Sequence, residues 1–307
     1  MKDIVAVGEV LIDLTQKGTD ELGVGQYAAN PGGAPANLAV AAARLGASTA
    51  FVGKVGADAF GAYLRRVLEE NRVDTRGMLT DPRERTTLAV VSVDGTGERS
   101  FSFYRDPSAD VNLRAEEIPA DLLRDTRIVH FGSVSLTAEP ARSATLYAAK
   151  TARKNGCLVS YDPNYRASLW HSQEEAVAQM KAALPLCDIL KVSDEELPLL
   201  TGTTDPAEGS RQLSALGIRL IFVTLGAEGA FFRMGEQTGS VPGIRVQVGD
   251  TNGAGDTFFG AALSLLVKED LDKLTLERLT QIAAFANKAA SITTSRHGAI
   301  PAMPTLE

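Results

Sequence analysis

Residues 249–256 read Gly249-Asp250-Thr251-Asn252-Gly253-Ala254-Gly255-Asp256 and lead directly into the apolar run 257–267. The run predicts a buried helix, because it is compact and nearly free of charge. The small residues 253–255 allow their backbone N–H groups to converge at the head of that helix, where the helix dipole also favours an anion such as phosphate. Beside such a site, the carboxylate of Asp256 can accept a proton from an attacking hydroxyl as a phosphoryl group moves. The alternative is a turn of small residues in which Asp256 is only an N-cap.

Composition narrows the class of protein. The 307 residues can form one large domain or two small ones, and a hydrophobic content of 44% supports a sizeable core. The net charge of −7 disfavours nucleic acid or an anionic membrane as the main partner, although a local cradle can still bind an anion. The first residues lack the pattern of a signal peptide, and no apolar run approaches the ~20 residues that span a bilayer. Cys157 and Cys187 lie in apolar surroundings without metal-ligand spacing, which predicts reduced thiols in the cytoplasm.

Strand and helix patterns alternate along most of the chain. Strands are predicted at residues 4–8 (continuing to 13), 49–55, 128–131, 158–162, 189–192 and 220–224, with short additions at 230–233 and 244–248. Strands that are apolar throughout and separated by helices indicate a parallel sheet covered on both faces. A β-rich pair at 86–93 and 99–104, joined by Asp94-Gly95-Thr96-Gly97, interrupts the alternation and predicts a hairpin. We interpret this hairpin as a small β lid beside the main domain.

A second glycine-rich segment precedes the helical pattern at residues 38–46. It reads Asn30-Pro31-Gly32-Gly33-Ala34-Pro35-Ala36-Asn37, with proline in the first helical turn and Gly46 as the C-terminal stop. Two other motifs are absent. The chain has no G-x-x-x-x-G-K-[ST], so it is not a P-loop enzyme, and its first strand lacks G-x-G-x-x-G, which disfavours a dinucleotide-binding dehydrogenase.

Taken in order, these segments resemble the ribokinase-like (PfkB) family of carbohydrate kinases over essentially the whole chain, and within it most closely the fructokinases. The resemblance is carried by residues 253–256 and by VGEVLID (7–13), PGGAPAN (31–37), FYRDPSAD (103–110) and SYDPNYR (160–166). It implies a single three-layer α/β domain over residues 1–307, with a central, mostly parallel sheet. It also implies a small β lid, formed mainly by the hairpin at about 86–105 and by part of the segment 14–30.

The resemblance implies a role for each matching position on the sugar side. Asp256 would be the catalytic base, and Gly253, Ala254 and Gly255 would form the anion hole. The sugar would be bound by Asp256 together with Asp13, Gly32, Gly33, Asn37, Phe103, Arg105 and Arg166. One carboxylate can accept two hydroxyls, and glycines allow the backbone to approach the sugar closely. Each of these residues also has an ordinary structural interpretation. Asp13 could cap a turn, Gly32 and Gly33 could form an ordinary approach to a helix, and Asn37 could face solvent. Arg105 and Arg166 could be surface residues, and Phe103 could be a core aromatic ring.

On the nucleotide side, the resemblance implies ATP contacts from Lys191, Ser193, Glu196, Thr224, Gly226, Gly229, Gly253, Gly255 and Asn287. Glu196 would help to position hydrated Mg²⁺ indirectly, its alternative being an ordinary first-turn helix acid. Asp250, with carbonyls near residues 294–299, would hold a monovalent cation such as K⁺. Ser193 and Asn252 depart from the family pattern, which usually has Asn and Thr at these places.

The resulting functional hypothesis is transfer of the ATP γ-phosphate to the primary hydroxyl of D-fructose. The nearest rival substrate is 2-keto-3-deoxygluconate, because its carboxylate suits Arg105 and Arg166. A catalytically silent sugar- or nucleotide-binding regulator is the rival from another class, and an oxidoreductase is a remote third. The lid hairpin has apolar residues on both faces and needs cover from a ligand, the body or a second subunit, which leaves a homodimer through the lid as an alternative.

Overall fold

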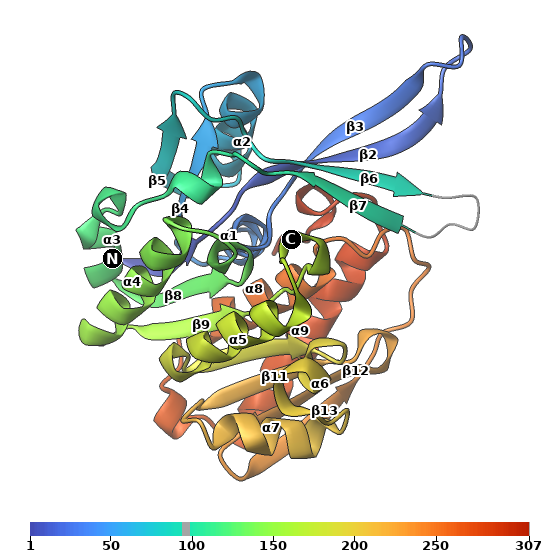
Figure 1. Ribbon diagram of the computed structural model, residues 1–307. Helices are drawn as coiled ribbons and strands as arrows, with labels where there is room; N and C mark the ends of the chain where they lie inside the picture. The colour runs from blue at the N-terminus through green and yellow to red at the C-terminus, as the bar shows by residue number, and fades with distance from the viewer. Residues whose placement is uncertain (94–98, 307) are drawn as a thin grey trace.

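The computed structural model describes residues 1–93 and 99–306, and it consists of an α/β body from which a small β-sheet projects (Figure 1). The predicted turn at 94–97 lies outside the described residues. The body sheet has nine strands in the order β13-β12-β11-β10-β9-β8-β1-β4-β5. Their bounds are β1 Lys2–Val7, β4 Thr49–Gly56, β5 Asp74–Asp81, β8 Thr126–Gly132, β9 Leu158–Asp162, β10 Ile189–Ser193, β11 Leu220–Thr224, β12 Gly229–Met234 and β13 Gln237–Pro242.

The body sheet is mostly parallel, as predicted. Every neighbouring pair from β5 to β11 is parallel, and β12 and β13 complete the edge in antiparallel pairing. The strand predicted at 244–248 is wrong: this segment follows β13 without strand structure, and its Ile244 and Val248 side chains are exposed. The edge strand is instead the more polar β13, whose backbone pairs with β12.

Helices cover both faces of the body sheet, because alternate residues of each strand face opposite layers. In β1, Val5 and Val7 belong to a core with helices α3 to α7, whereas Ile4 packs in a core with α1, α8 and α9. One layer contains α3 Ala120–Arg124, α4 Ala141–Lys154, α5 Gln173–Ala183, α6 Glu196–Thr201 and α7 Pro206–Ser214; the other contains α1 Ala34–Arg44, α2 Ala59–Glu70, α8 Ala254–Leu266 and α9 Leu276–Thr294. The predicted three-layer α/β architecture is confirmed, and among the described residues no helix is both long and apolar enough to cross a membrane.

Helix α8 is the predicted apolar helix, and its packing on α1 prepares the site. Phe258 and Phe259 are fully buried in the core that α1, α8 and α9 share. A Cβ added at Gly260 would lie 2.8 Å from the Leu38 carbonyl oxygen of α1. Because glycine allows this close approach, the first turns of the two helices lie together at one end of the sheet.

The small sheet has the order β3-β2-β6-β7, with β2 Leu11–Thr19, β3 Gly25–Gly32, β6 Leu88–Val93 and β7 Arg99–Tyr104. The predicted strand pair at 86–104 is present as β6 and β7, which pair antiparallel. The run predicted as one strand from 4 to 13 is divided instead: the chain leaves the body sheet after β1 and enters the small sheet at Leu11. Gly8 and Glu9 therefore lie at the junction of the two sheets.

Candidate functional site

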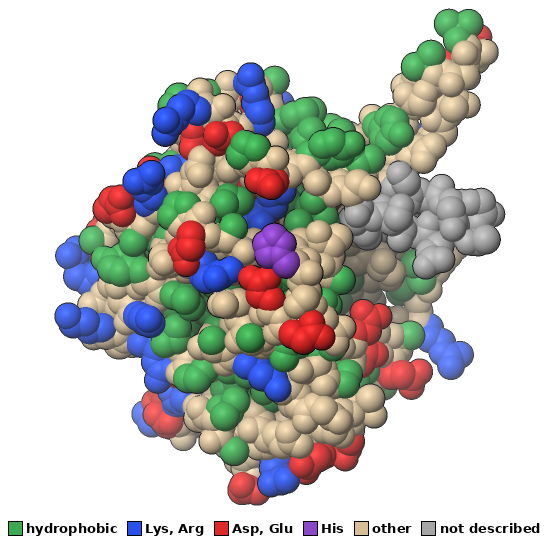
Figure 2. Space-filling view, viewed as in Figure 1, with side chains coloured by type: hydrophobic (Ala, Val, Ile, Leu, Met, Phe, Trp, Pro, Cys, Tyr) green, Lys and Arg blue, Asp and Glu red, His purple; other side chains and the backbone are tan. Residues whose placement is uncertain are grey.

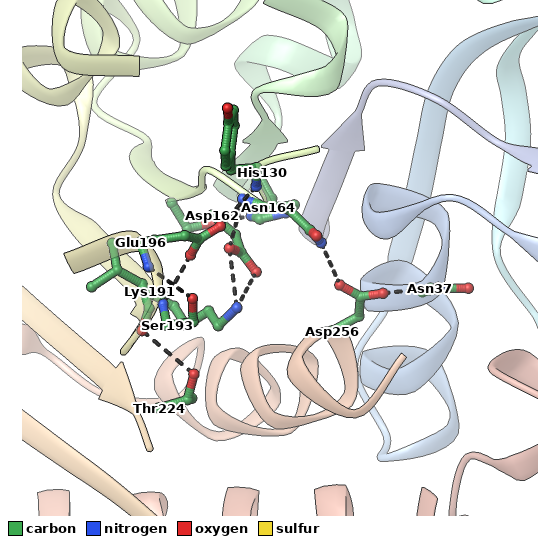
Figure 3. Close-up of polar contacts among 12 residues, drawn as sticks. Asn37, His130, Asp162, Asn164, Lys191, Ser193, Glu196, Thr224 and Asp256 are labelled. Carbon is green, nitrogen blue, oxygen red and sulfur yellow. Dashed lines mark hydrogen bonds and ion pairs between the residues drawn. The ribbon is translucent and has the colours of Figure 1, made fainter. Parts of the chain in front are cut away.

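The carboxylate of Asp256 lies in the first turn of α8, between two asparagine side chains. Asn37 of α1 donates from Nδ2 to Oδ2 at 2.8 Å, and Asn164, which follows β9, donates from Nδ2 to Oδ1 at 2.9 Å (Figure 3). Burial raises the pKa of Asp256, while the Asn37 hydrogen bond and the charge of Lys191 oppose the rise. The two amides fix the orientation of the carboxylate, and the raised pKa makes it a stronger base.

The backbone at the head of α8 offers donors for an anion. Gly253 precedes the helix with a φ of +73°, which glycine adopts without strain. The Ala254 N–H reaches the Thr251 carbonyl oxygen at a long 3.3 Å, and the N–H groups of Gly255 and Asp256 donate no hydrogen bond within the described part of the chain. A helix head with uncommitted N–H groups is an anion-binding geometry.

A buried ion pair adds positive charge next to this helix head. Lys191 of β10 lies 3.0 Å from Asp162 at the end of β9, and both side chains are buried (Figure 3). Burial alone would lower the pKa of Lys191, but the carboxylates of Asp162 and Glu196 outweigh it and raise the pKa. A Cβ added at Gly255 would lie 3.1 Å from Lys191 Nζ. The ammonium group is thus held charged beside the amides of α8.

Glu196 and Ser193 form a reciprocal cap at the start of α6. The Ser193 N–H donates to Glu196 Oε2 at 2.8 Å, and the Glu196 N–H donates to Ser193 Oγ at 3.2 Å. Glu196 Oε1 accepts the Tyr165 N–H at 2.7 Å. Both residues line a cavity of about 230 Å³ with Asn164, Arg166 and Lys191. Glu196 therefore orders the backbone around this cavity, and Ser193 supplies the capping oxygen.

A second cavity, of about 70 Å³, lies between the small sheet and the head of α8. Of the predicted sugar-side residues, it brings together Asp13, Gly33, Asn37, Phe103, Arg166 and Asp256. Burial raises the pKa of Asp13 to about 7, although the charge of Arg166 opposes the rise. Gly32 lies behind Asp13, where an added Cβ would collide with the carboxyl group. Three carboxyl groups face this cavity, because Glu9 also lines it.

Arg105 is not among the residues that line either cavity. Its Nε donates to Asp110 at 2.8 Å, Nη1 to Thr137 at 2.5 Å and Nη2 to the Val134 carbonyl oxygen at 3.1 Å. The side chain is 9% exposed, so it forms a buried network at the end of β7. One partner in this network, Val134, lines the smaller cavity, but Arg105 itself does not, and a sugar contact by Arg105 stays a prediction.

The remaining predicted residues join loops around the body. Asp250 accepts the N–H groups of Asn252 at 2.9 Å and Gly298 at 3.2 Å, which connects the segment before α8 to the predicted loop after α9. Asn287 donates to the Pro242 carbonyl oxygen at 2.8 Å. Thr224 ends β11, and Gly226 and Gly229 follow it with positive φ angles. Within the described residues there is no group of three or more acidic, histidine or cysteine side chains arranged to hold a metal directly.

Comparison with known families matches residues 1–306 to the model described as pfkB family carbohydrate kinase. The chain belongs to this family. It is 44% identical over 305 residues to probable fructokinase-2 of Arabidopsis thaliana, covering 98% of this chain and 93% of the relative. As a member of the carbohydrate kinases, the protein is a phosphotransferase that acts on a sugar hydroxyl.

Solved structures agree over the whole chain. The ATP-bound fructokinase of Xylella fastidiosa has a TM-score of 0.92 and 35% identity, covering 99% of this chain and 95% of that one. A double mutant of the Vibrio cholerae O395 fructokinase, with fructose, ADP and potassium ion bound, has a TM-score of 0.90 and 36% identity, covering 100% and 96%. This pfkB kinase thus shares its fold with fructokinases solved with ATP, or with fructose and ADP, bound.

Three residues at the site were missed by the sequence reasoning. Asn164 and Asp162 both lie in the segment 160–166, and a polar residue at or just past the end of a parallel strand is the signal that could have singled them out. Glu9 lies two residues beyond β1 and carries the same signal. A polar side chain at a strand end becomes a site residue only if other segments converge on it, which depends on the tertiary structure.

Proposed function

We propose that this pfkB kinase is a fructokinase, which transfers the γ-phosphate of ATP to the primary hydroxyl of D-fructose to form fructose 6-phosphate. The observation that carries the proposal is the Asp256 carboxylate, held by Asn37 and Asn164 where the smaller cavity meets the head of α8. The names of the full-length relatives support fructose as the sugar. The test is ADP release that requires fructose, and its absence would favour a silent sugar- or nucleotide-binding regulator.

In this proposal, the sugar lies under the small sheet, which serves as the lid of a single kinase domain. Asp13, Gly33, Asn37 and Arg166 bind its hydroxyls, and Phe103 covers it from β7. Asp256 takes the proton of the attacking hydroxyl, while the amides at 253–255 and the Lys191 ammonium stabilise the charge that spreads over the transferred phosphoryl group. Holding both reactants in line and excluding water supplies much of the rate.

The proposal includes two metal ions, Mg²⁺ near Glu196 and K⁺ near Asp250. Both Glu196 oxygens accept backbone N–H groups, and each keeps a second lone pair for a water molecule, which fits an indirect contact to hydrated Mg²⁺. Mg²⁺ would neutralise phosphate charge. Asp250 orders the loop whose carbonyls would hold K⁺, and the potassium-bound relative supports this site. Nucleotide contacts from Thr224, Gly226, Gly229 and Asn287 belong to the same proposal.

The charge of the smaller cavity supports fructose over 2-keto-3-deoxygluconate. Glu9, Asp13 and Asp256 line it, and Arg166 is the one lysine or arginine in its described lining. Arg105 is neutralised by Asp110. We expect kcat/KM for fructose to exceed that for 2-keto-3-deoxygluconate by at least about 100-fold, because like charges in a buried site cost several kcal/mol. A coupled assay of ADP release with each sugar measures the ratio, and a preference for the acid would contradict the fructose assignment.

We further propose that two copies associate through the small sheet. The turn that joins β2 to β3 of this sheet carries the exposed apolar side chains of Leu22, 88% exposed, and Val24, 56% exposed. Figure 2 shows hydrophobic side chains at the tip of this projecting hairpin. Light scattering should give a dimer for the wild type and a monomer for the Leu22→Glu, Val24→Glu double variant. Leu216→Glu, at an exposed leucine outside the small sheet, is the control. A monomeric wild type at tens of micromolar would overturn this proposal.

The two cysteines support the proposed cytoplasmic location. Cys157 and Cys187 are both buried as free thiols. Burial raises the pKa of Cys187 well above its ordinary value, so this thiol stays protonated and inert. Cell fractionation with an antibody to the protein tests the location, and recovery from an oxidising compartment would contradict it.

A further inference from the structure

Glu9 lies at the junction of the two sheets and contacts the start of helix α1. Its side chain is 3% exposed, and its Oε1 accepts the backbone N–H of Ala34 at 3.0 Å. Ala34 is the first residue of α1, and the N-cap position before it is Gly33, which has no side chain to cap the helix. Glu9 therefore supplies the missing cap from 25 residues away.

The capped amide lies between two groups of the proposed sugar site. Gly33, directly before it, has a φ of +100° and lines the smaller cavity; an added Cβ there would lie 2.6 Å from the Glu9 carbonyl oxygen. Asn37 follows one turn later, with its N–H bonded to the Gly33 carbonyl oxygen at 2.8 Å. The Asn37 side chain donates to Asp256. A shift of the first turn of α1 would therefore move both the cavity wall and a donor to the base.

We propose that Glu9 is a positioning residue, which fixes the first turn of α1 through the Ala34 amide and so places Gly33 against the sugar and Asn37 against Asp256. The inference rests on the proposed fructokinase reaction for its kinetic readout. It adds to that reaction a residue that lies at the wall of the sugar cavity and acts through the backbone of α1.

The surroundings of Glu9 indicate that its acceptor oxygen matters more than its charge. Oε2 is buried and has no hydrogen-bond partner within the described residues. Burial raises the pKa of Glu9 to about 7, an effect that Asp110 adds to and Arg105 opposes. The other charged groups that line the cavity are Asp13, Asp256 and Arg166. Glutamine keeps an oxygen for the Ala34 N–H, so a neutral side chain of the same length should serve.

Three substitutions of Glu9 separate the effects of its side-chain length, its acceptor oxygen and its negative charge. Glu9→Gln keeps the acceptor, and we expect its kinetics to stay within about threefold of wild type. Glu9→Asp keeps the charge but is one methylene too short, and Glu9→Met keeps the length but has no oxygen. Both should raise the KM for fructose about tenfold or more and lower kcat, because Gly33 and Asn37 shift together, whereas the KM for ATP should stay within about twofold.

A pH profile gives a readout that a purely structural role would not change. The Asn37 hydrogen bond lowers the pKa of Asp256, so weakening it should move the acid limb of the kcat profile to higher pH. We expect this movement in Glu9→Met and Glu9→Asp and not in Glu9→Gln. Glu70→Gln, at an exposed glutamate on α2, is the control for loss of a carboxylate.

Several outcomes would overturn the inference. They are wild-type kinetics in Glu9→Met, equal damage in Glu9→Gln and Glu9→Met, or equal increases in the KM for fructose and for ATP. If Glu9→Met does not fold, Glu9→Asp against Glu9→Gln makes the same comparison. A wild type without fructose-dependent ADP release would contradict the proposed function instead. In that case, amide hydrogen exchange at Ala34 tests whether Glu9 fixes the first turn of α1. Exchange should be slow in wild type and Glu9→Gln and fast in Glu9→Asp and Glu9→Met.

Discussion

Replacing Asp256 by asparagine should lower kcat by about 10³-fold or more, with the KM for fructose and for ATP within about threefold of wild type. The carboxylate is the group that accepts the hydroxyl proton, and loss of a general base costs roughly 10² to 10⁴ in rate. Its buried position adds to the loss, because no solvent base can replace it. Steady-state kinetics with ADP release, together with calorimetric titration of fructose, separate the loss of chemistry from a loss of binding.

Asp256→Glu is the matched control for this variant, because it keeps the base and moves it by one methylene. It should fall between wild type and Asp256→Asn. Asparagine also places an NH₂ group against one of two amide donors, so Asn37 or Asn164 must turn its carbonyl oxygen inward. Unchanged kcat in Asp256→Asn would refute the role of Asp256 as the base and remove the main support for the kinase mechanism.

Replacing Asp13 by alanine should lower kcat/KM for fructose by about 10² to 10³, mainly through KM. Hydrogen bonds to a charged group contribute about 1.5–3 kcal/mol each, and the Asp13 carboxylate can accept two sugar hydroxyls. The KM for ATP should change little, because Asp13 lies on the small sheet and lines the smaller cavity. Asp125→Ala, at an exposed aspartate paired with Arg124, is the control.

The pH dependence of fructose binding gives a second measure of Asp13. Its pKa is raised to about 7, so the empty site carries a proton on this group below neutral pH. Hydroxyls donate stronger hydrogen bonds to an ionised carboxylate than to a neutral carboxyl group, so fructose should bind more tightly as pH rises through about 7. In Asp13→Ala this increase should be reduced. An Asp13→Ala variant with wild-type KM would contradict the assignment of Asp13 to the sugar.

Local sequence patterns predicted most of the framework. Apolar runs between helical patterns predicted the parallel strands, and the charge-free run after Asp256 predicted the buried helix α8. The same reasoning failed at 244–248. Residues with high β-propensity form a strand only where a neighbouring strand can pair with them, and the more polar β13 occupies the position beside β12. The same reasoning predicted one strand over residues 4–13, where the structure has β1 and the start of β2. An apolar sequence pattern does not show where the chain leaves one sheet and enters another.

The sequence by itself determined the family, the layers of the fold and the two small-residue helix approaches at Gly33 and Gly253, because local chemistry and spacing are sufficient for these. Only the tertiary structure decided which of the candidate polar side chains form hydrogen bonds or ion pairs with other parts of the protein. Arg105 forms an ion pair with Asp110, and Glu196 accepts hydrogen bonds from two backbone amides. Glu9 accepts the N–H of the first residue of α1. The physical reason is that a polar side chain takes its role from the partners that burial brings within hydrogen-bond distance, and those partners come from distant parts of the chain.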